Sequence, residues 1–459
     1  MTRQVVFPVT RMHEPLRVEV EVQNGRVADA WISGTMFRGF EFMMVGRDPR
    51  DAVLFTQRIC GICSSAHAVA GGLALEQAFG VQPTPDGQLL INLILAADFL
   101  QNHLRHFYLL AMLDYVTVDG MPPFAPQKNW DLRLPKAVSD TLVDHAKKAV
   151  QVSAKAHSMF ALFGGKAPMQ QTIIPTGVSH IIESDRIMAY SSMLKEVLAF
   201  IEEAYIADVL TIAQYYPDYY ELGAGYGNLL SYGMFLEAGE RIFPAGVAIG
   251  KGAVAGLSLS DITESTHASW YGDQTGSGEM QLNPDKEGAY SWVKAPRYQG
   301  LAVEGGPLAR GWISGEYHRG VSVMDRLVAR AKESLKIAAL AEKWLGKLAP
   351  GAPAFQVYTP PERGEGIGLT DSMRGALGHW LAYENGRITR YQIITPTGWN
   401  FSPRDEKGLR GPVEEALIGI PVKDPENLVE IGRVIRSFDP CFSCAVHAFE
   451  VPSAREGVK

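Results

Sequence analysis

Arg58-Ile-Cys-Gly-Ile-Cys-Ser-Ser-Ala-His67 lies near the start of this chain, and Asp439-Pro-Cys-Phe-Ser-Cys-Ala-Val-His447 lies near its end. Each stretch contains one Cys-x-x-Cys pair, and the two pairs account for all four cysteines among 459 residues. A disulfide scaffold would be dense in a short secreted chain, which this is not. The distribution therefore needs a chemical reason.

Three chemical interpretations of the cysteine pairs compete. A thiol redox couple normally uses one Cys-x-x-Cys on a strand-to-helix turn, so two pairs at opposite ends suit it poorly. A four-thiolate zinc site usually has its pairs about 15 to 20 residues apart. A catalytic soft-metal site, assembled where the two ends of a large domain meet, fits the spacing best, because thiolates select nickel, copper(I), zinc and iron over hard cations. The residues alone predict a metal site and leave its metal open.

The segments next to the cysteine pairs predict β-hairpins. Asn24-Gly25 joins two apolar runs, and Asn-Gly is the strongest short-range hairpin signal in a sequence. Asp29 interrupts the second of these runs, and we expect it on the same face as Val27 and Trp31. A second Asn-Gly at Asn385-Gly386 predicts another hairpin towards the other end of the chain.

Long helices are predicted between the hairpins, because apolar residues recur there at spacings of three and four. Ser184-Asp185 supplies a candidate N-cap, and Pro350-Gly351 a candidate stop. The glycine- and proline-rich stretch 217–311 predicts loops and short strands. We expect an α+β fold that is predominantly helical, with one domain over residues 1–447 and a central bundle of helices near 86–113, 136–163, 185–216 and 321–348.

Composition excludes several classes of function. The chain is 46% hydrophobic and 20% charged, as soluble globular proteins are, and its formal charge of -7 without a Lys/Arg cluster argues against nucleic acid as a partner. No apolar run approaches the roughly 18 to 20 residues that cross a bilayer. The N-terminus lacks the apolar region of a signal peptide. We therefore expect a soluble protein, either cytoplasmic or exported, and associated with a membrane only through partners. If it is exported, we expect the export signal to be on another chain.

Both cysteine stretches, with five further segments, closely resemble the signatures of nickel-iron hydrogenase large subunits, and the resemblance covers essentially the whole chain. It implies the large-subunit fold, with peripheral β-hairpins around the helical bundle. It also implies reversible, heterolytic cleavage of dihydrogen. The further segments are Thr35–Glu41, Gly46–Asp51, Arg374–Trp380, Thr395–Asn400 and Pro403–Asp405.

The resemblance assigns a role to each matching residue. Cys60 and Cys441 would be terminal nickel ligands, and Cys63 and Cys444 would bridge nickel to an iron that also carries carbon monoxide and cyanide. The proton would go to Cys441 or to Arg374, whose guanidinium would lie over the open metal face. The remaining implied positions are Glu41, the carbonyl of Ile393 and His447 around magnesium, Leu377 and Thr397 around the iron ligands, and His67 as a hydrogen-bond partner of a bridging cysteine.

Some of these residues also have ordinary structural interpretations. Glu41 and Arg38 can form a surface ion pair, and His67 can be a buried imidazole with satisfied hydrogen bonds. His103 and His106 look like a metal-binding pair on a helix, but we expect them to be structural because thiolates already fill the site.

Three departures from the family pattern affect particular assignments. His13 stands where many members have a glutamate that passes protons from a terminal cysteine, and Glu14 is one residue later, on the opposite face if the segment is a strand. Asn102 replaces a usual aspartate, so we expect a neutral amide to hold Arg374 less firmly. Met373 and Met169 replace a frequent proline and histidine.

The resemblance also implies partners. All cysteines are used in the two pairs, so electrons must leave through iron-sulfur clusters of a separate small subunit in a heterodimer. Residues 448–459 would be a maturation extension, cut after His447 by a protease once nickel-insertion proteins have delivered the metal. We expect turnover in the uptake direction. A hydrogen sensor is the alternative, although sensors commonly lack the extension, and nickel-free relatives in quinone oxidoreductases lack the cysteine pairs.

Overall fold

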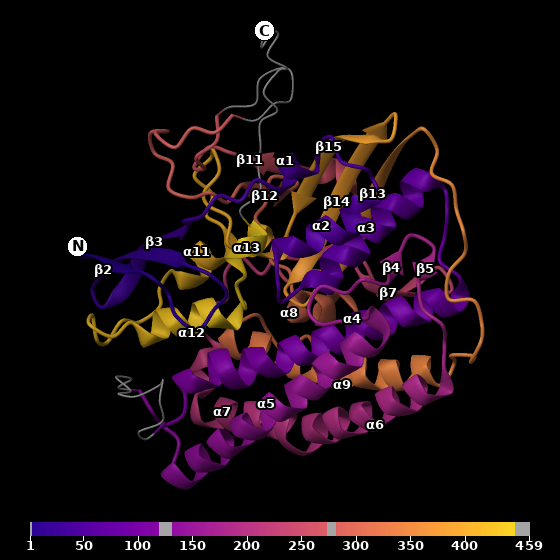
Figure 1. Cartoon of the computed structure of the whole chain (residues 1–459). Coiled ribbons are helices and arrows are strands. Elements are labelled where there is room, and N and C mark those ends of the chain that lie inside the picture. The colour runs from indigo at the N-terminus through magenta and orange to yellow at the C-terminus, as the bar shows by residue number, and fades with distance from the viewer. Residues whose placement is uncertain (1, 119–130, 273–280, 446–459) are drawn as a thin grey trace.

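The computed structural model describes residues 2–118, 131–272 and 281–445. Its N-terminal sheet contains β1 (Thr2–Val6), β2 (Leu16–Gln23) and β3 (Arg26–Gly34) in that order, all antiparallel (Figure 1). Asn24 and Gly25 have φ of 52° and 70°, the left-handed conformation that a two-residue hairpin turn requires. The first predicted hairpin is therefore confirmed.

The face assigned to Asp29 was wrong in part. A register shift after Glu21 leaves Ala28 without a partner on β2, and this bulge reverses which side chains face the core. Val27 is buried before the bulge and Ala30 after it, whereas Asp29 lies on the outer face. There its carboxylate binds Arg404 and Arg410, so the charge that interrupts the apolar run is paired outside the core.

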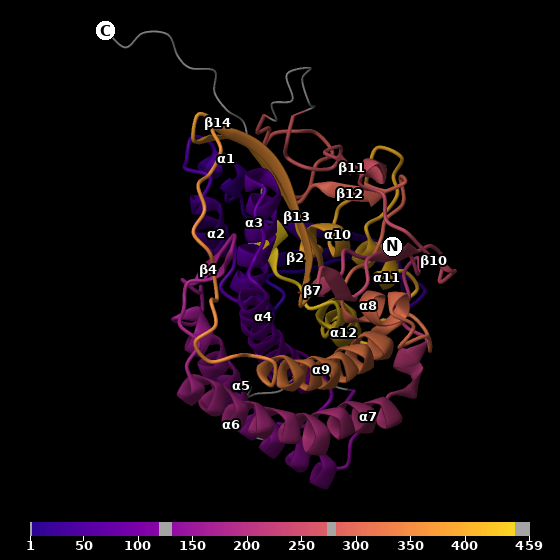
Figure 2. The same ribbon diagram turned by 90° about the vertical axis from the view of Figure 1, so that its right-hand side faces the viewer.

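The predicted helical bundle is confirmed. α4 packs against α5 and α9, α5 packs against α6, and Figure 2 shows α9 lying over α6 and α7. Ser184 does not cap α6 as expected, because the helix includes it and no side chain caps that end. Side-chain caps are instead supplied by Thr84 to α4 and Ser322 to α9. The helices are α4 (Pro85–Arg105), α5 (Lys136–Gly164), α6 (Ser184–Phe200), α7 (Ile206–Tyr215) and α9 (Val323–Leu345).

Two of the predicted helices contain π-helical turns that periodicity did not show. One follows α4 as η2 (His106–Ala111), and the other joins α6 to α7 as η4 (Ile201–Tyr205). A π-turn inserts a residue without ending the apolar stripe, so the spacing of apolar residues still reads as one helix.

A second sheet, β13 (Arg363–Ser372), β14 (Gly375–Glu384) and β15 (Arg387–Ile394), confirms the Asn385-Gly386 hairpin. Helix α3 (Ser64–Phe79) lies directly on β13. The close approach is possible because every second residue of β13 is glycine where the helix passes. A Cβ added at Gly368 would lie 1.8 Å from the carbonyl oxygen of Ala70, and one at Gly366 would lie 1.9 Å from that of Ala74.

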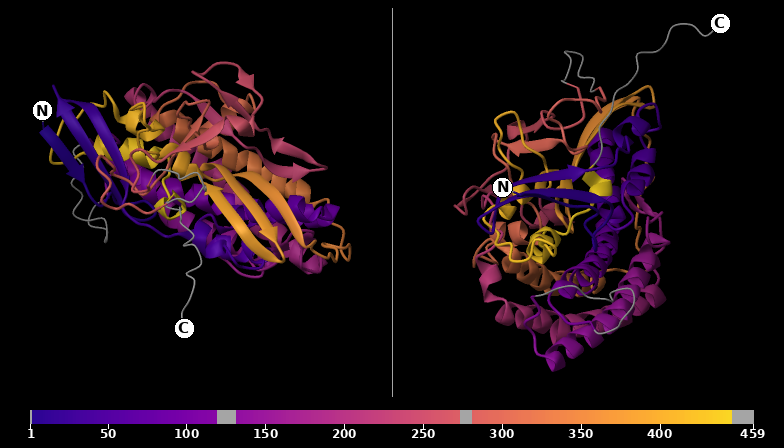
Figure 3. Two further views of the ribbon diagram at one scale, coloured as in Figure 1. Left: turned by 90° about the horizontal axis from the view of Figure 1, so that it is seen from above. Right: turned by 90° about the vertical axis from the view of Figure 1, so that its left-hand side faces the viewer.

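The stretch 217–311 contains loops and short strands, as predicted. Seen from above, the N-terminal sheet (indigo) and the β13–β15 sheet (orange) lie on opposite sides of the short yellow helix Phe442–Ala445 (Figure 3). The remaining strands are β4 (Ile173–Ile174), β5 (Gly177–Val178), β6 (Leu229–Ser231), β7 (Met234–Glu237), β8 (Glu240–Phe243), β9 (Gly246–Ala248), β10 (Val254–Ala255), β11 (Ile262–Ser265) and β12 (Ala295–Tyr298).

Short helices complete the fold and carry several site residues. They are α1 (Phe40–Met44), α2 (Asp51–Thr56), η1 (Gln57–Ile59), η3 (Met112–Asp114), η5 (Pro217–Tyr220), η6 (Leu259–Asp261), α8 (Pro307–Ile313), α10 (Pro396–Asn400), α11 (Pro412–Leu417), α12 (Val429–Ser437) and α13 (Phe442–Ala445). Within the described ranges, no helix has both the length and the apolar character needed to cross a bilayer.

Candidate metal centre

The four cysteines come together as one buried thiol cluster, Cys60, Cys63, Cys441 and Cys444. Their sulfur atoms all lie within 4.8 Å of one another. The Sγ atoms of Cys60 and Cys441 are 3.2 Å apart, and Cys444 Sγ lies 3.1 Å from both Cys63 Sγ and Cys441 Sγ. A disulfide would need about 2.05 Å, so all four thiols are free. The two ends of the chain thus meet at one site.

The first cysteine pair is held by a change of backbone direction. Cys60 follows η1 in an extended conformation, and its sulfur accepts a hydrogen bond from the backbone N–H of Ile62 at 3.3 Å. Cys63 is the N-cap residue of α3, so the positive end of the helix dipole lies beside its sulfur. The dipole favours a thiolate there, against the burial that raises the pKa of this thiol.

The second pair is fixed by contacts with distant segments. The backbone N–H of Cys441 donates to Thr397 Oγ1 at 3.0 Å, and the N–H of Phe442 donates to the carbonyl of His13 at 3.1 Å. The Arg38 guanidinium donates to the carbonyls of Ile59 and Ser443, so it joins the two cysteine segments directly. The suggested Arg38–Glu41 surface pair was therefore wrong.

The cluster has the chemistry of a soft-cation site. Burial raises the pKa of Cys63 and Cys444 well above that of an ordinary thiol. Burial also acts to raise the pKa of Cys441, but hydrogen bonds with the other three cysteines and the charge of Arg374 bring it well below its usual value. Four thiolates would place four negative charges in one buried volume, so the cluster needs cations that bind sulfur. Nickel and iron fit these donors.

Arg374 supplies a positive charge beside the cluster. With Met373 it forms the two-residue turn between β13 and β14. Burial acts to lower its pKa, but the charges of Asp439, Cys441, Cys63 and Cys60 raise it, so the guanidinium stays protonated. Its Nε and Nη1 are buried without a hydrogen-bond partner. Two unused donors on a buried cation next to four sulfurs are suited to a further anionic or polar ligand of a metal.

The hold on Arg374 is firmer than the sequence led us to expect. Its Nη2 donates to Asn102 Oδ1 at 3.3 Å, as expected, but it also binds Asp439 Oδ1 at 3.1 Å. Asn102 in turn donates to Asp98 Oδ1 at 3.0 Å, one helical turn earlier. Carboxylates at two other positions thus support the guanidinium, and the expected weak orientation by a neutral amide alone was wrong.

Apart from the thiol cluster, a group of buried oxygen donors suits a hard cation. Glu41 on α1 and Glu264 on β11 both face Lys294, whose Nζ lies 3.7 Å from Glu41 Oε1 and 2.9 Å from Glu264 Oε2. Burial raises the pKa of Glu41 to about 7 against the opposing charge of Lys294. Two carboxylates facing one ammonium leave one negative charge uncompensated, and magnesium fits such oxygen donors. The contact that the structure gives between Glu41 and Ile393 is to the N–H of Ile393, at 2.7 Å; His447 lies outside the described residues.

His13 and Glu14 face different surroundings. The His13 ring hydrogen-bonds Cys60: burial lowers its pKa, but this bond and the charges of Cys441 and Cys60 raise it to about 9. Glu14 has φ of 71°, and its Oε2 is buried without a hydrogen-bond partner. The structure therefore brings His13, and not Glu14, into contact with a cysteine of the cluster.

The remaining histidines that the sequence singled out bind protein groups. The Nδ1 atom of His67 lies 3.1 Å from Nε2 of His379, so its hydrogen bond among the described contacts goes to a second imidazole and not to a cysteine. His103 Nε2 lies 2.8 Å from Glu333, and His106 Nε2 lies 2.6 Å from the carbonyl of Arg436. The structural interpretation of His103 and His106 fits these contacts.

Two further positions named from the sequence lie in the protein interior. Leu377 on β14 and Thr397 on α10 are both buried. Sequence reasoning gave Arg38 only a surface ion pair with Glu41 and gave no role to Asp98 or Asp439, although Arg38 and Asp439 lie within the motifs quoted above. Only their place inside those motifs could have drawn attention to them, because their partners are far away in sequence.

Comparisons with known proteins agree with this geometry. The family described as nickel-dependent hydrogenase matches residues 38–134, 122–320 and 313–447. The periplasmic [NiFeSe] hydrogenase large subunit of Desulfomicrobium baculatum is 38% identical, over 99% of this chain and 96% of its own length. The uptake hydrogenase large subunit of Bradyrhizobium diazoefficiens is 30% identical, over 100% of this chain and 97% of its own.

A solved structure shows the same fold. The Ni-Fe-Se hydrogenase of Desulfovibrio vulgaris Hildenborough in the reduced state superposes with a TM-score of 0.93 at 40% identity, over 97% of this chain and 100% of that one. The names of two of these relatives include selenium, whereas the four clustered residues here are all cysteines.

Proposed function

This chain belongs to the nickel-dependent hydrogenases as a large subunit, and we propose that it cleaves dihydrogen heterolytically and reversibly into protons and electrons. The observation that carries the proposal is the buried thiol cluster beside a protonated guanidinium with two unused donors. A nickel-iron pair bound there would supply Lewis acidity and a template for the gas. Cys60 and Cys441 would bind nickel alone, and Cys63 and Cys444 would bind both metals.

Different side chains hold the positive charge, accept the proton and carry it away. Arg374 remains charged, because Asp439 and the thiolates stabilise its protonated form, so it acts as a fixed positive charge and not as the base. Cys441 is then the residue that accepts the proton. Cys60 Sγ lies 3.2 Å from Cys441 Sγ and hydrogen-bonds His13, so the proton leaves the cluster along these two side chains.

Magnesium would be held by Glu41 in the pocket shared with Lys294 and Glu264, together with the Ile393 carbonyl and His447. Carbon monoxide and cyanide on the iron would lie against Leu377 and Thr397, with the free N–H groups of Arg374 beside them. Glu264, Lys294 and Ile393 line a small cavity that also borders Cys444, so a cation held beside them would also fix the position of the second cysteine pair.

Electrons would pass to the iron-sulfur clusters of a small subunit, because this chain has no cysteine outside the two pairs. We propose the uptake direction on the strength of the Bradyrhizobium relative's name. Residues 448–459 would be removed after nickel insertion, so that a chain ending at His447 closes the site.

Isotope exchange tests the proposal without any electron acceptor. The purified large–small complex is kept under D2 in ordinary water, and the release of HD and H2 is followed by mass spectrometry. Heterolytic cleavage predicts steady exchange by a subunit whose mass corresponds to residues ending at His447. A nickel-loaded complex that exchanges no isotope would contradict the proposed chemistry.

A further inference from the structure

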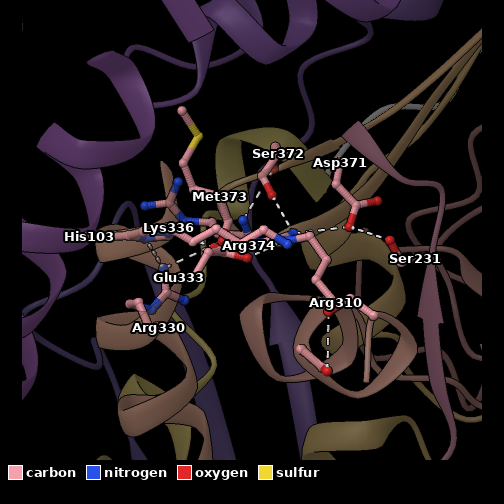
Figure 4. Close-up of polar contacts among 12 residues, drawn as sticks. His103, Ser231, Arg310, Arg330, Glu333, Lys336, Asp371, Ser372, Met373 and Arg374 are labelled. Atoms are coloured by element: carbon pink, nitrogen blue, oxygen red, sulfur yellow. Dashed lines mark hydrogen bonds and ion pairs between the residues drawn. The ribbon is translucent and has the colours of Figure 1, made fainter. Parts of the chain in front are cut away.

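A continuous network of buried charged side chains extends from Arg374 into the helical bundle, away from the thiol cluster. Its members come from helices α4, α8 and α9, from strand β13, from the β13–β14 turn and from the loop between α12 and α13. Figure 4 shows most of them in contact. We call it the charge network: Arg374, Asp439, Arg330, His103, Glu333, Arg310 and Asp371. The side chains involved are between 0% and 4% exposed.

The contacts follow one another in a fixed order. Asp439 Oδ1 accepts a hydrogen bond from Arg374 Nη2 at 3.1 Å, and Asp439 Oδ2 forms an ion pair with Arg330 Nη1 at 3.1 Å without a hydrogen bond of its own. Nη1 of Arg330 also lies 2.9 Å from His103 Nδ1, and His103 Nε2 lies 2.8 Å from Glu333 Oε2. The path from the guanidinium beside the cluster to His103 therefore has two intermediate residues.

The far end of the network is rigid. Arg310 binds Glu333 through two parallel hydrogen bonds of 2.6 and 2.8 Å, and its Nη1 binds Asp371 at 3.0 Å. Asp371 also accepts the N–H of Tyr232 at 2.8 Å. A bidentate guanidinium–carboxylate pair fixes both partners in orientation as well as in distance, so Glu333 presents its Oε2 to His103 from a fixed position.

The tautomer of His103 follows from its two partners. A guanidinium only donates, so His103 Nδ1 must accept from Arg330 and carries no proton. Nε2 then carries the ring proton and donates it to Glu333. Burial lowers the pKa of His103 to about 4, which agrees with a neutral ring. A doubly protonated ring would remove the acceptor and place a second cation against Arg330.

We infer that His103 is a positioning residue for Arg374: its neutral ring fixes Arg330, Arg330 fixes Asp439, and Asp439 aims the Arg374 guanidinium at the thiol cluster. Arg330 depends on this contact, because its Nε is buried without a hydrogen-bond partner. Without His103, Arg330 Nη1 would keep the ion pair with Asp439 and a long contact of 3.4 Å to the Met373 carbonyl, so Arg330 and Asp439 could shift together. The inference rests on the proposed role of Arg374.

Three variants of the complete enzyme test the inference. His103→Leu removes both ring contacts, whereas His103→Gln keeps an oxygen acceptor for Arg330 and an N–H donor for Glu333. His145→Leu is the matched control, because it removes another histidine–carboxylate contact, to Asp208 at 2.8 Å, outside the network. Turnover per nickel, KM for dihydrogen, metal content and the electron paramagnetic resonance signal of nickel are measured for each.

We expect His103→Leu to keep both metals and its KM while kcat falls about 10- to 100-fold, since small displacements of a catalytic group have effects of that size. Its nickel signal should change, and His103→Gln should restore most of the rate. If His103→Leu does not fold, Arg330→Lys replaces it, because Nη1 of Arg330 makes both contacts and a lysine ammonium ends one bond short of that atom.

Wild-type turnover and an unchanged nickel signal in His103→Leu, or in Arg330→Lys, would overturn the inference. So would a His103→Gln enzyme as impaired as the leucine variant, because that result would mean that ring volume and not hydrogen bonding matters. Arg374→Lys distinguishes the proposed role of Arg374 from the inferred role of His103. If Arg374→Lys and His103→Leu both have normal turnover, the proposed role of Arg374 fails. If Arg374→Lys is impaired and His103→Leu is not, only the inference about His103 fails.

Discussion

The thiol cluster and the charge network are neighbours built on opposite electrostatic principles. The cluster brings together four thiols, which all become negative when they ionise. Arg374 is the cation whose charge lowers the pKa of one of them, Cys441. The network contains three guanidiniums, three carboxylates and a neutral imidazole, so its charges cancel within the protein. The cluster therefore needs bound metal to balance its charge, whereas the charges of the network balance one another without metal. A buried charge is stable only when its compensation is present.

The largest effect is expected from breaking the cluster. Cys63→Ser or Cys444→Ser should abolish assembly of the metal pair, because a hydroxyl is a poor ligand for soft metals shared between two centres. Ser443→Ala, between the two C-terminal cysteines, keeps all four thiols and should keep the metals. Elemental analysis of the purified subunits measures this. Nickel and iron at wild-type levels in either serine variant would remove the bridging role.

Arg374, where the two regions meet, should show a large effect of a different kind. Arg374→Lys should keep nickel and iron but lower turnover by orders of magnitude, because a flexible ammonium cannot reproduce a planar guanidinium held by Asp439 and Asn102. Hydrogen uptake per nickel is the measurement. A rate near that of the wild type would mean that the two regions are chemically independent.

Breaking the network should cost stability in the metal-free protein. Glu333→Gln leaves Arg310 and Arg330 short of one negative charge, at a cost of about 3–5 kcal/mol. Burial acts to raise the pKa of Glu333, but the charge and hydrogen bonds of Arg310 lower it to about 2, below its ordinary 4.5. Its ionised form therefore stabilises the fold above pH 4.5, and this stabilisation is lost as the pH falls from 4.5 towards 2.

Thermal unfolding midpoints of the metal-free proteins at pH 7, 4 and 3 test this prediction. The deficit of Glu333→Gln should be largest at pH 7 and should shrink at each lower pH. Asp140→Asn, which removes an exposed ion pair with Lys136, should leave the midpoint almost unchanged at every pH. A deficit that is constant over this range would show that the charge of Glu333 is not what stabilises the network.

The smallest effect concerns the packing that joins the two regions, because α3 begins next to Cys63 and β13 carries Asp371. Gly368→Ala would place a methyl group against the carbonyl of Ala70 and force the helix outward, at a cost of about 1–3 kcal/mol. Gly256→Ala, where a Cβ meets nothing within 4 Å, is the control. Equal unfolding midpoints for the two alanine variants would show that the close approach carries no strain.

The sequence revealed those features whose signal is local. The Cys-x-x-Cys pairs, the two Asn-Gly turns and the long helices each lie within a short window, and the structure has all of them. The roles of individual metal ligands, the proton path through His13 and the maturation cut after His447 stay predictions. The boundary of the domain at residue 447 also stays a prediction, because the described residues end at Ala445.

Features that depend on distant partners could not be read from the sequence. Arg330 and Glu333 look like ordinary charged positions of an amphipathic helix, yet their partners His103 and Asp439 are more than 100 residues away. The bulge that turns Asp29 outward depends on strand register, which a single strand's pattern does not encode. The support of Arg374 by Asp439 could not be predicted for the same reason, because the two residues are 65 positions apart in the sequence.

Metal analysis of the mature large subunit, separated from the iron-sulfur small subunit, tests the central claim most directly. The thiol cluster predicts nickel and iron in about equal amounts, because two Cys-x-x-Cys pairs provide the soft ligands and all cysteines of the chain are in them. Serine variants of the cluster provide the background level of adventitious metal. Zinc alone at full occupancy, with neither nickel nor iron above that background, would contradict a hydrogenase centre in this protein.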